Sequence, residues 1–135
     1  MTQEILILLA VLLLLFTLTS IQVVITMMNY GTVNSLGGRD EIPYLQPGLG
    51  GRLHRAIANL KEGLHLFTPI ILLTAILGVS NDQTLLGAKL FLIARVLHAP
   101  LYISGIVSLR TLAYFLSIIG IVLIVSGLLT SSVVM

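Results

Sequence analysis

No cysteine occurs among the 135 residues of this sequence. Disulfide bonds, thiolate-ligated metals and a cysteine nucleophile are therefore excluded, and any thiol chemistry needs a thiol that a ligand brings in. Charge is also scarce, because Asp, Glu, Lys and Arg make up 9% of the residues, whereas a soluble domain carries roughly 25%. The seven basic residues are too few and too scattered for nucleic-acid binding.

Hydrophobic residues, by contrast, make up 57% of the chain, and the mean hydropathy is +1.11. With so little polar surface, lipid must surround most of the molecule, and helices satisfy every backbone amide within their own segment. An apolar stretch of about 20 residues is long enough to span the hydrocarbon core. We therefore predict one all-α integral membrane domain over residues 1–135, a four-transmembrane-helix bundle with spans at about 5–28, 55–79, 85–107 and 111–134.

The connections and their charges predict the orientation. Residues 29–51 form the only long predicted loop, because glycine and proline are frequent there. The cations in or beside this loop are Arg39, Arg52 and Arg55, and Arg110 lies at the third connection. The opposite face has one nearby cation, Lys89. Because positively charged connections tend to remain in the cytoplasm, the first and third connections are expected there, with both termini on the other side.

Three polar residues of the second span share one helical face. Arg55, Asn59 and Glu62 are spaced i, i+4 and i+7, and residues at this spacing line up along a helix. A charged residue at the centre of a spanning helix costs about 2.5–3.5 kcal/mol. Such residues therefore need a structural or functional partner within the membrane.

The third span repeats this pattern with Arg95, His98 and Tyr102, spaced i, i+3 and i+7. Because the second and third spans are antiparallel neighbours, Glu62 and Arg95 fall at similar depth. An ion pair between them is geometrically plausible, and each charge would offset the desolvation of the other. Such a pair could serve helix packing alone.

Cations remain in surplus after that pairing. In the spans no further carboxylate can neutralise them, and only Asp40 and Glu41 of the loop could do so. A guanidinium binds a carboxylate in a bidentate fork, so an anionic ligand with carboxylates would explain the surplus. Lipid headgroups at the membrane interface are the alternative. The surplus cations and the neutral polar residues lie near the same end of the predicted bundle. The cations are Arg52, Arg55 and Arg110, and the neutral residues are Asn59, His98, Tyr102 and Tyr114.

No metal site is predicted. His54 lies just before the second span and His65 lies within it, and neither has partners at a convincing metal-ligand spacing. Roles at the membrane interface or in packing are expected for both.

Two segments resemble the MAPEG family, the membrane-associated proteins in eicosanoid and glutathione metabolism. Residues 52–67, RLHRAIANLKEGLHLF, resemble its signature R-x-x-R-A-x-x-N-x-x-E-x-x-x-x-F. Residues 95–102, RVLHAPLY, with the following Gly105 and Arg110, are similar to the third-helix motif of the family. Residues 36–40, LGGRD, match a pattern that is frequent in bacterial-type members.

The resemblance implies a homotrimer that binds glutathione between neighbouring subunits near the cytoplasmic face. Arg55, Asn59 and Glu62 would hold the polar ends of the tripeptide, with Glu62 facing its amino group. Arg95 would support Glu62. The same resemblance places further residues at the site, namely Arg52, His98, Tyr102 and Tyr114.

Arg110 corresponds to the arginine that synthases of this family place beside the glutathione thiol, which makes it the predicted catalytic residue. The implied activity is that of a glutathione transferase or peroxidase acting on lipophilic electrophiles or lipid hydroperoxides. Two departures matter: Ala58 stands where some members have a second arginine, and the interval from Tyr102 to Arg110 differs slightly from that of the animal synthases. Some members bind lipids without catalysis, so a lipid-binding or scaffold protein is the alternative. A transporter is disfavoured because the first span offers few polar residues.

Overall fold

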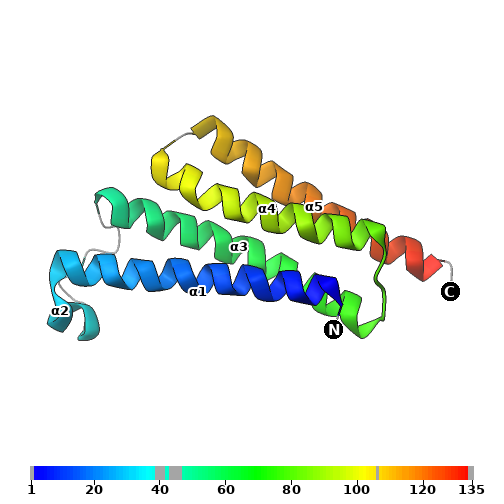
Figure 1. Ribbon diagram of the computed structural model, residues 1–135, viewed down its shortest axis with the longest axis horizontal. Coiled ribbons are helices and arrows are strands. Elements are labelled where there is room, and N and C mark those ends of the chain that lie inside the picture. Colours follow the sequence, from blue (N-terminus) through cyan, green and yellow to red (C-terminus); the bar gives the residue numbers. More distant parts are fainter. Residues whose placement is uncertain (1, 39–41, 43–46, 106, 134–135) are drawn as a thin grey trace.

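The computed structural model describes residues 2–38, 42, 47–105 and 107–133, and in these residues every regular element is a helix (Figure 1). Four of the helices are long and apolar enough to cross a membrane. The prediction of an all-α, four-span membrane bundle is therefore confirmed. The elements are α1 (Gln3–Tyr30), α2 (Thr32–Leu36), α3 (Gly48–Ile76), α4 (Asp82–Ser104) and α5 (Val107–Val133).

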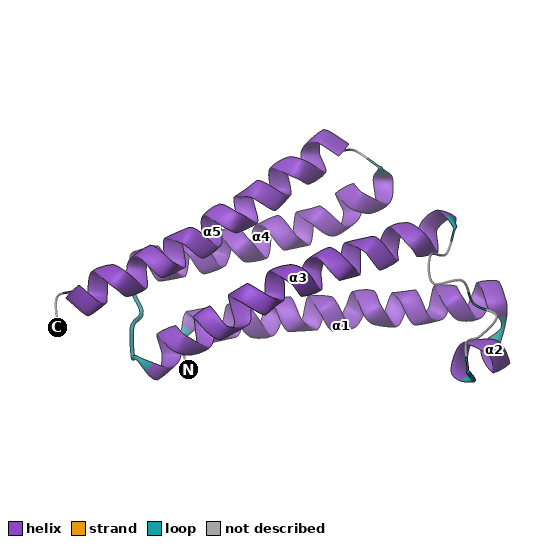
Figure 2. Cartoon of the chain, turned by 180° about the vertical axis from the view of Figure 1, so that it is seen from behind, coloured by secondary structure: helices purple, strands orange, loops and turns teal. Residues whose placement is uncertain are grey.

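The four long helices form two pairs. Helices α1 and α3 lie side by side, and α4 and α5 make the most extensive helix contact in the molecule (Figure 1). Both chain termini lie at one end, while the α1–α3 and α4–α5 connections lie at the other, as Figure 2 shows from behind. The two pairs diverge toward the end that carries these connections. The first and third connections thus share one face, as the sequence predicts.

Two glycines bring α4 and α5 into backbone contact. A Cβ atom added to Gly120 would lie 2.6 Å from the carbonyl oxygen of Gly87 and 3.0 Å from the amide nitrogen of Phe91. Small residues permit such close approach between membrane helices, where dispersion contacts replace the hydrophobic effect as the driving force. The α4–α5 hairpin is consequently the tightest part of the bundle.

A buried carboxylate ties the helices together at the end where the termini lie. Glu4 of α1 is 0% exposed and accepts hydrogen bonds from Ser80 Oγ at 2.9 Å and Thr84 Oγ1 at 2.8 Å. Asn81 caps α4 by accepting a hydrogen bond from the Thr84 amide at 2.9 Å, and its Nδ2 donates to the Gly127 carbonyl at 3.0 Å. One polar cluster therefore joins α1, α4 and α5. The sequence placed Glu4 at this end but did not predict its burial.

The helix ends differ from the sequence-based spans, most clearly in α3. This helix begins at Gly48 instead of residue 55 and includes the glycine-rich stretch that was expected to be loop. Pro47 occupies the N-cap position, and both Gly50 and Gly51 are buried, so close packing outweighs the low helix propensity of glycine. The predicted loop also contains α2. Its residues Arg39, Asp40 and Glu41, and the span end at 134, lie outside the described residues.

Candidate functional site

The amphipathic pattern of α3 determines which of its side chains face the bundle. Apolar residues recur every three or four positions, so they form one continuous stripe that packs inward. Arg55 and Glu62 are exposed because they lie off this stripe, as are Lys61 and His65. The buried stripe consists of Leu53, Ile57, Leu60, Leu64, Phe67 and Ile71.

Arg95 of α4 is the buried cation of the site. Its side chain is only 4% exposed, and its Nη1 donates a hydrogen bond of 2.6 Å to Oδ1 of Asn59 on α3. Its Cζ lies 5.0 Å from the ring centroid of Phe91, one turn earlier on α4, within the range of a cation–π contact. Phe91 itself stacks on Phe67 of α3, with ring centroids 3.9 Å apart. The buried Arg95 Nε has no hydrogen-bond partner among the described residues.

The predicted ion pair between Arg95 and Glu62 is not formed in the described part of the chain. Glu62 is exposed, and the contact that Arg95 makes with α3 is to the neutral Asn59. Three residues correspond to about 300° of helical rotation, so Glu62 lies about 60° around the axis from Asn59. The Glu62 carboxylate is therefore exposed and not paired directly with Arg95, although it lies near enough to attract the Arg95 guanidinium electrostatically.

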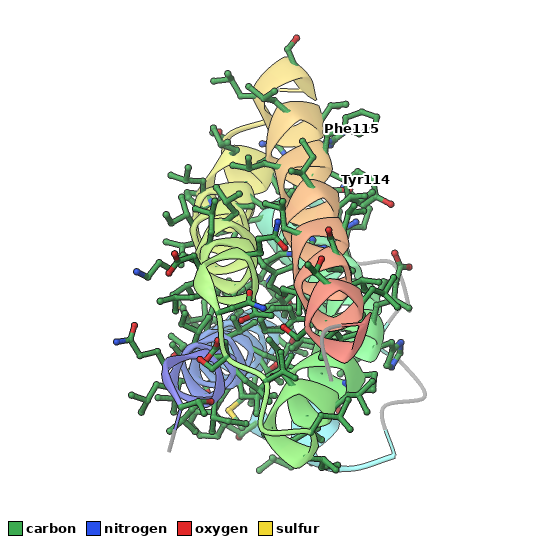
Figure 3. The ribbon with its side chains drawn as sticks, turned by 90° about the vertical axis from the view of Figure 1, so that its right-hand side faces the viewer. Tyr114 and Phe115 are labelled. Carbon is green, nitrogen blue, oxygen red and sulfur yellow. The ribbon has the colours of Figure 1, made fainter. Side chains whose placement is uncertain are left out.

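Aromatic side chains hold the remaining polar groups near the α4–α5 connection. His98 is 4% exposed, and its ring centroid lies 5.6 Å from that of Tyr102. Arg110 of α5 lies over the Tyr102 ring, with its Cζ 4.6 Å from the centroid of that ring. Tyr114 and Phe115 project from α5 on the side opposite α4 in Figure 3, with ring centroids 5.9 Å apart.

Arg52 has a structural contact at the same end. Its Nη1 donates a hydrogen bond of 3.0 Å to the carbonyl oxygen of Ile103. The last carbonyls of a helix lack intrahelical partners, so this exposed arginine caps α4 and links it to α3. Gly105 follows in a left-handed conformation with φ of 80°, which ends the helix.

The structure thus brings together part of the predicted site. Arg95 of α4 contacts Asn59 of α3, and Arg110 of α5 lies over Tyr102 of α4, whereas Arg55 and Glu62 are exposed on the single chain. In the described residues, no carboxylate forms an ion pair with an arginine of the site, and no group of three potential metal ligands occurs. The inward group comprises Asn59, Arg95, His98, Tyr102 and Arg110.

Sequence reasoning missed two residues that shape this site. Phe91 lies beneath the Arg95 guanidinium, and Gly63 lies against it. An isolated glycine inside a helical pattern is itself a signal of close approach. A phenylalanine in an apolar span carries no comparable signal, because most such residues serve only the core.

A family model described as the MAPEG family matches residues 5–130. The match includes every polar residue of the candidate site. No curated protein and no solved structure matches the chain.

Proposed function

Since the chain belongs to the MAPEG family, we propose that it is a glutathione-dependent membrane transferase or peroxidase. Its substrates are lipophilic electrophiles or lipid hydroperoxides that reach the site from the bilayer. The coarser assignment, a membrane protein of the glutathione and eicosanoid type, follows from the family. The activity and the residue roles are the proposal.

The observation that carries the proposal is the buried positive charge of Arg95, which forms no direct ion pair within the described part of the chain. This guanidinium is 4% exposed within a membrane-spanning helix, and its hydrogen-bond partner Asn59 is neutral. A charged residue at such a depth costs about 2.5–3.5 kcal/mol. An anionic ligand beside Arg95 would offset this cost, and glutathione supplies two carboxylates for that purpose.

The exposed charges of α3 support binding between subunits. Arg55, Lys61 and Glu62 are exposed on one helix, and the last two lie near its midpoint. Lipid chains cannot solvate charges at that depth, so another protein surface or a ligand must cover them. We propose a homotrimer in which Arg55, Asn59 and Glu62 hold the polar ends of glutathione, Glu62 facing its amino group.

Arg110 is proposed to stabilise the glutathione thiolate. The ring of Tyr102 supports its guanidinium from one side, and a nearby cation lowers the pKa of a thiol. The thiolate sulfur would then bond to an electrophilic carbon as the leaving group departs with its electron pair. With a hydroperoxide, the sulfur would take the terminal oxygen and release an alcohol, and a second glutathione would convert the sulfenic acid to a disulfide and water.

Thiolate formation accounts for only part of the expected rate gain. Lowering a thiol pKa from about 8.5 to about 6.5 raises the thiolate fraction at pH 7 about 25-fold. The nucleophilicity of a thiolate falls as its pKa falls. With a Brønsted coefficient of about 0.5, this effect reduces the gain about tenfold. The remaining acceleration must come from holding the thiolate against a lipid-delivered substrate.

The positive charges also support a cytoplasmic location of the site. Arg52, Arg55 and Arg110 gather at the end that carries the first and third connections, and positively charged connections tend to remain in the cytoplasm. We therefore place both termini on the opposite side of the membrane.

Calorimetric titration of glutathione into the detergent-purified protein tests this function, with Glu62→Ala as the comparison. We expect the wild type to bind and the variant to bind more weakly, because the variant lacks the carboxylate that faces the ligand amine. A conjugation assay with a generic aryl halide then tests catalysis. A wild-type protein that ignores glutathione refutes the proposal.

A second candidate function is non-enzymatic lipid binding. The exposed Arg52 and Arg55 in the first turns of α3 also suit headgroup phosphates at the interface. Glutathione binding without conjugating or peroxidase activity would favour this alternative.

A further inference from the structure

Gly63 lies where α3 approaches the Arg95 guanidinium most closely. It follows Asn59 by four residues, so both lie on nearly the same side of the helix. A Cβ atom added to Gly63 would lie 2.7 Å from Arg95 Cζ and 3.0 Å from Arg95 Nε, and it would overlap Nη2. The guanidinium therefore rests on the α3 backbone, in space that any larger residue would fill.

Three contacts define the position of this guanidinium. The Gly63 backbone borders it on one side, the Phe91 ring lies 5.0 Å from its Cζ, and Asn59 Oδ1 accepts its Nη1 hydrogen at 2.6 Å. The stack of Phe91 on Phe67 holds that ring in place. Arg95 is consequently held by side chains and backbone from both α3 and α4.

The hydrogen bond from Arg95 also orients the Asn59 amide. A guanidinium only donates hydrogen bonds, so the oxygen of the amide must face Arg95, and its nitrogen must point the other way. Among the residues that the structure describes, none accepts a hydrogen bond from that nitrogen. Among the described residues, Asn59 thus presents a free N–H donor group beside the exposed Arg55 and Glu62.

We infer that Gly63 is a positioning residue of the proposed glutathione site. By carrying no side chain, it lets Arg95 lie against α3, and Arg95 in turn holds the Asn59 amide with its N–H donors directed at a ligand carboxylate or carbonyl. This inference rests on the proposed function. It assigns to Gly63 a role that acts through Arg95 and Asn59 and needs no contact with the ligand.

The atoms that an added Cβ would meet at Gly63 distinguish this positioning role from a role in helix packing. At Gly120, an added Cβ would meet backbone atoms of α4, which can move only if the helices separate. At Gly63, it would meet the far end of a flexible arginine side chain. Gly63→Ala should therefore displace Arg95 and leave the fold intact.

Glutathione titration of four forms of the purified protein tests the inference: wild type, Gly63→Ala, Arg95→Met and the double variant. We expect Gly63→Ala to raise the Kd about tenfold, which is what one misdirected hydrogen bond costs, with a fall in thermal midpoint no larger than that of the Gly127→Ala control. In the Arg95→Met background the same substitution should change the Kd less than about twofold, because the residue through which it acts is absent. Equal effects in both backgrounds, or no effect in the wild-type background, would overturn the inference.

Gly127→Ala is the matched control. Its added methyl would also press on side chains, with Asn81 Oδ1 and Thr84 Cγ2 each 2.9 Å away, but at the opposite end of the bundle. It should lower the thermal midpoint and leave the glutathione Kd unchanged, and an equal rise in Kd would show that Gly63→Ala acts only by loosening the bundle.

Asn59→Asp examines the amide orientation independently of Gly63. The aspartate keeps an acceptor for Arg95 but has no N–H donor, so its glutathione Kd should rise about tenfold. Binding as tight as that of the wild type would show that the amide nitrogen contacts no ligand. A wild-type protein that does not bind glutathione would refute the proposed function itself, whereas wild-type binding with an unaffected Gly63→Ala refutes only this inference.

Discussion

Replacing Arg95 with methionine should separate ligand binding from stability. The arginine is buried at membrane depth, where its charge costs about 2.5–3.5 kcal/mol. Its hydrogen bond to Asn59 contributes about 1.5–3 kcal/mol, and its contact with Phe91 about 0.5–2 kcal/mol. These terms nearly cancel, and methionine has a similar length and flexibility. We therefore expect the ligand-free Arg95→Met protein to be within about 2 kcal/mol of the wild type.

Ligand binding should respond much more strongly. Losing one charge-assisted hydrogen bond to a ligand carboxylate costs about 1.5–3 kcal/mol, which raises the Kd about 10- to 100-fold. At a glutathione concentration of 100 times the wild-type Kd, the ligand stabilises the wild type by about 2.7 kcal/mol. The same concentration should stabilise Arg95→Met by only about 0.4–1.4 kcal/mol.

Thermal unfolding in detergent, with and without glutathione, measures both quantities in one experiment. The expected result is a similar midpoint for the two ligand-free proteins and a much smaller glutathione-induced shift for the variant. If Arg95→Met instead unfolds readily without ligand but keeps the full glutathione-induced shift, Arg95 is a packing residue and the argument from its buried charge fails.

Two further predictions concern catalysis and the polar end of the bundle. Arg110→Ala should reduce turnover of an aryl halide, measured by steady-state kinetics, far more than glutathione affinity. Arg55→Ala should mainly weaken glutathione affinity, measured by calorimetry. Equal effects on turnover and affinity in both variants would contradict these roles. Glu4→Leu should destabilise the protein by about 1–3 kcal/mol, because it removes the acceptor of the Ser80 hydroxyl at 2.9 Å. Glu62→Leu is the control, since the Glu62 carboxylate is exposed. Equal losses of stability for the two variants in denaturant titrations would show that the buried hydrogen bonds of Glu4 contribute nothing specific.

Membrane insertion and the number of spans could be predicted because both depend on composition along the chain. A run of apolar residues needs lipid around it and a helix within it, wherever its neighbours lie. The family could be predicted as well, because its motifs are local patterns in residues 52–67 and 95–110. The helix ends were less predictable: α3 extends back to Gly48 because buried glycines pack there, and packing is not a local property.

Helical periodicity places Arg55, Asn59 and Glu62 on roughly one face of a spanning helix, so this relation can be read from their spacing alone. Which of the three meets Arg95 depends instead on how the helices pack. The rotation of α3 about its axis is set by its apolar stripe against α1 and α4. This rotation brings Asn59 and Gly63 into contact with Arg95, while Glu62 stays exposed. Spacing gives the angle between residues on one helix, but the direction in which that face points depends on every helix packed against it.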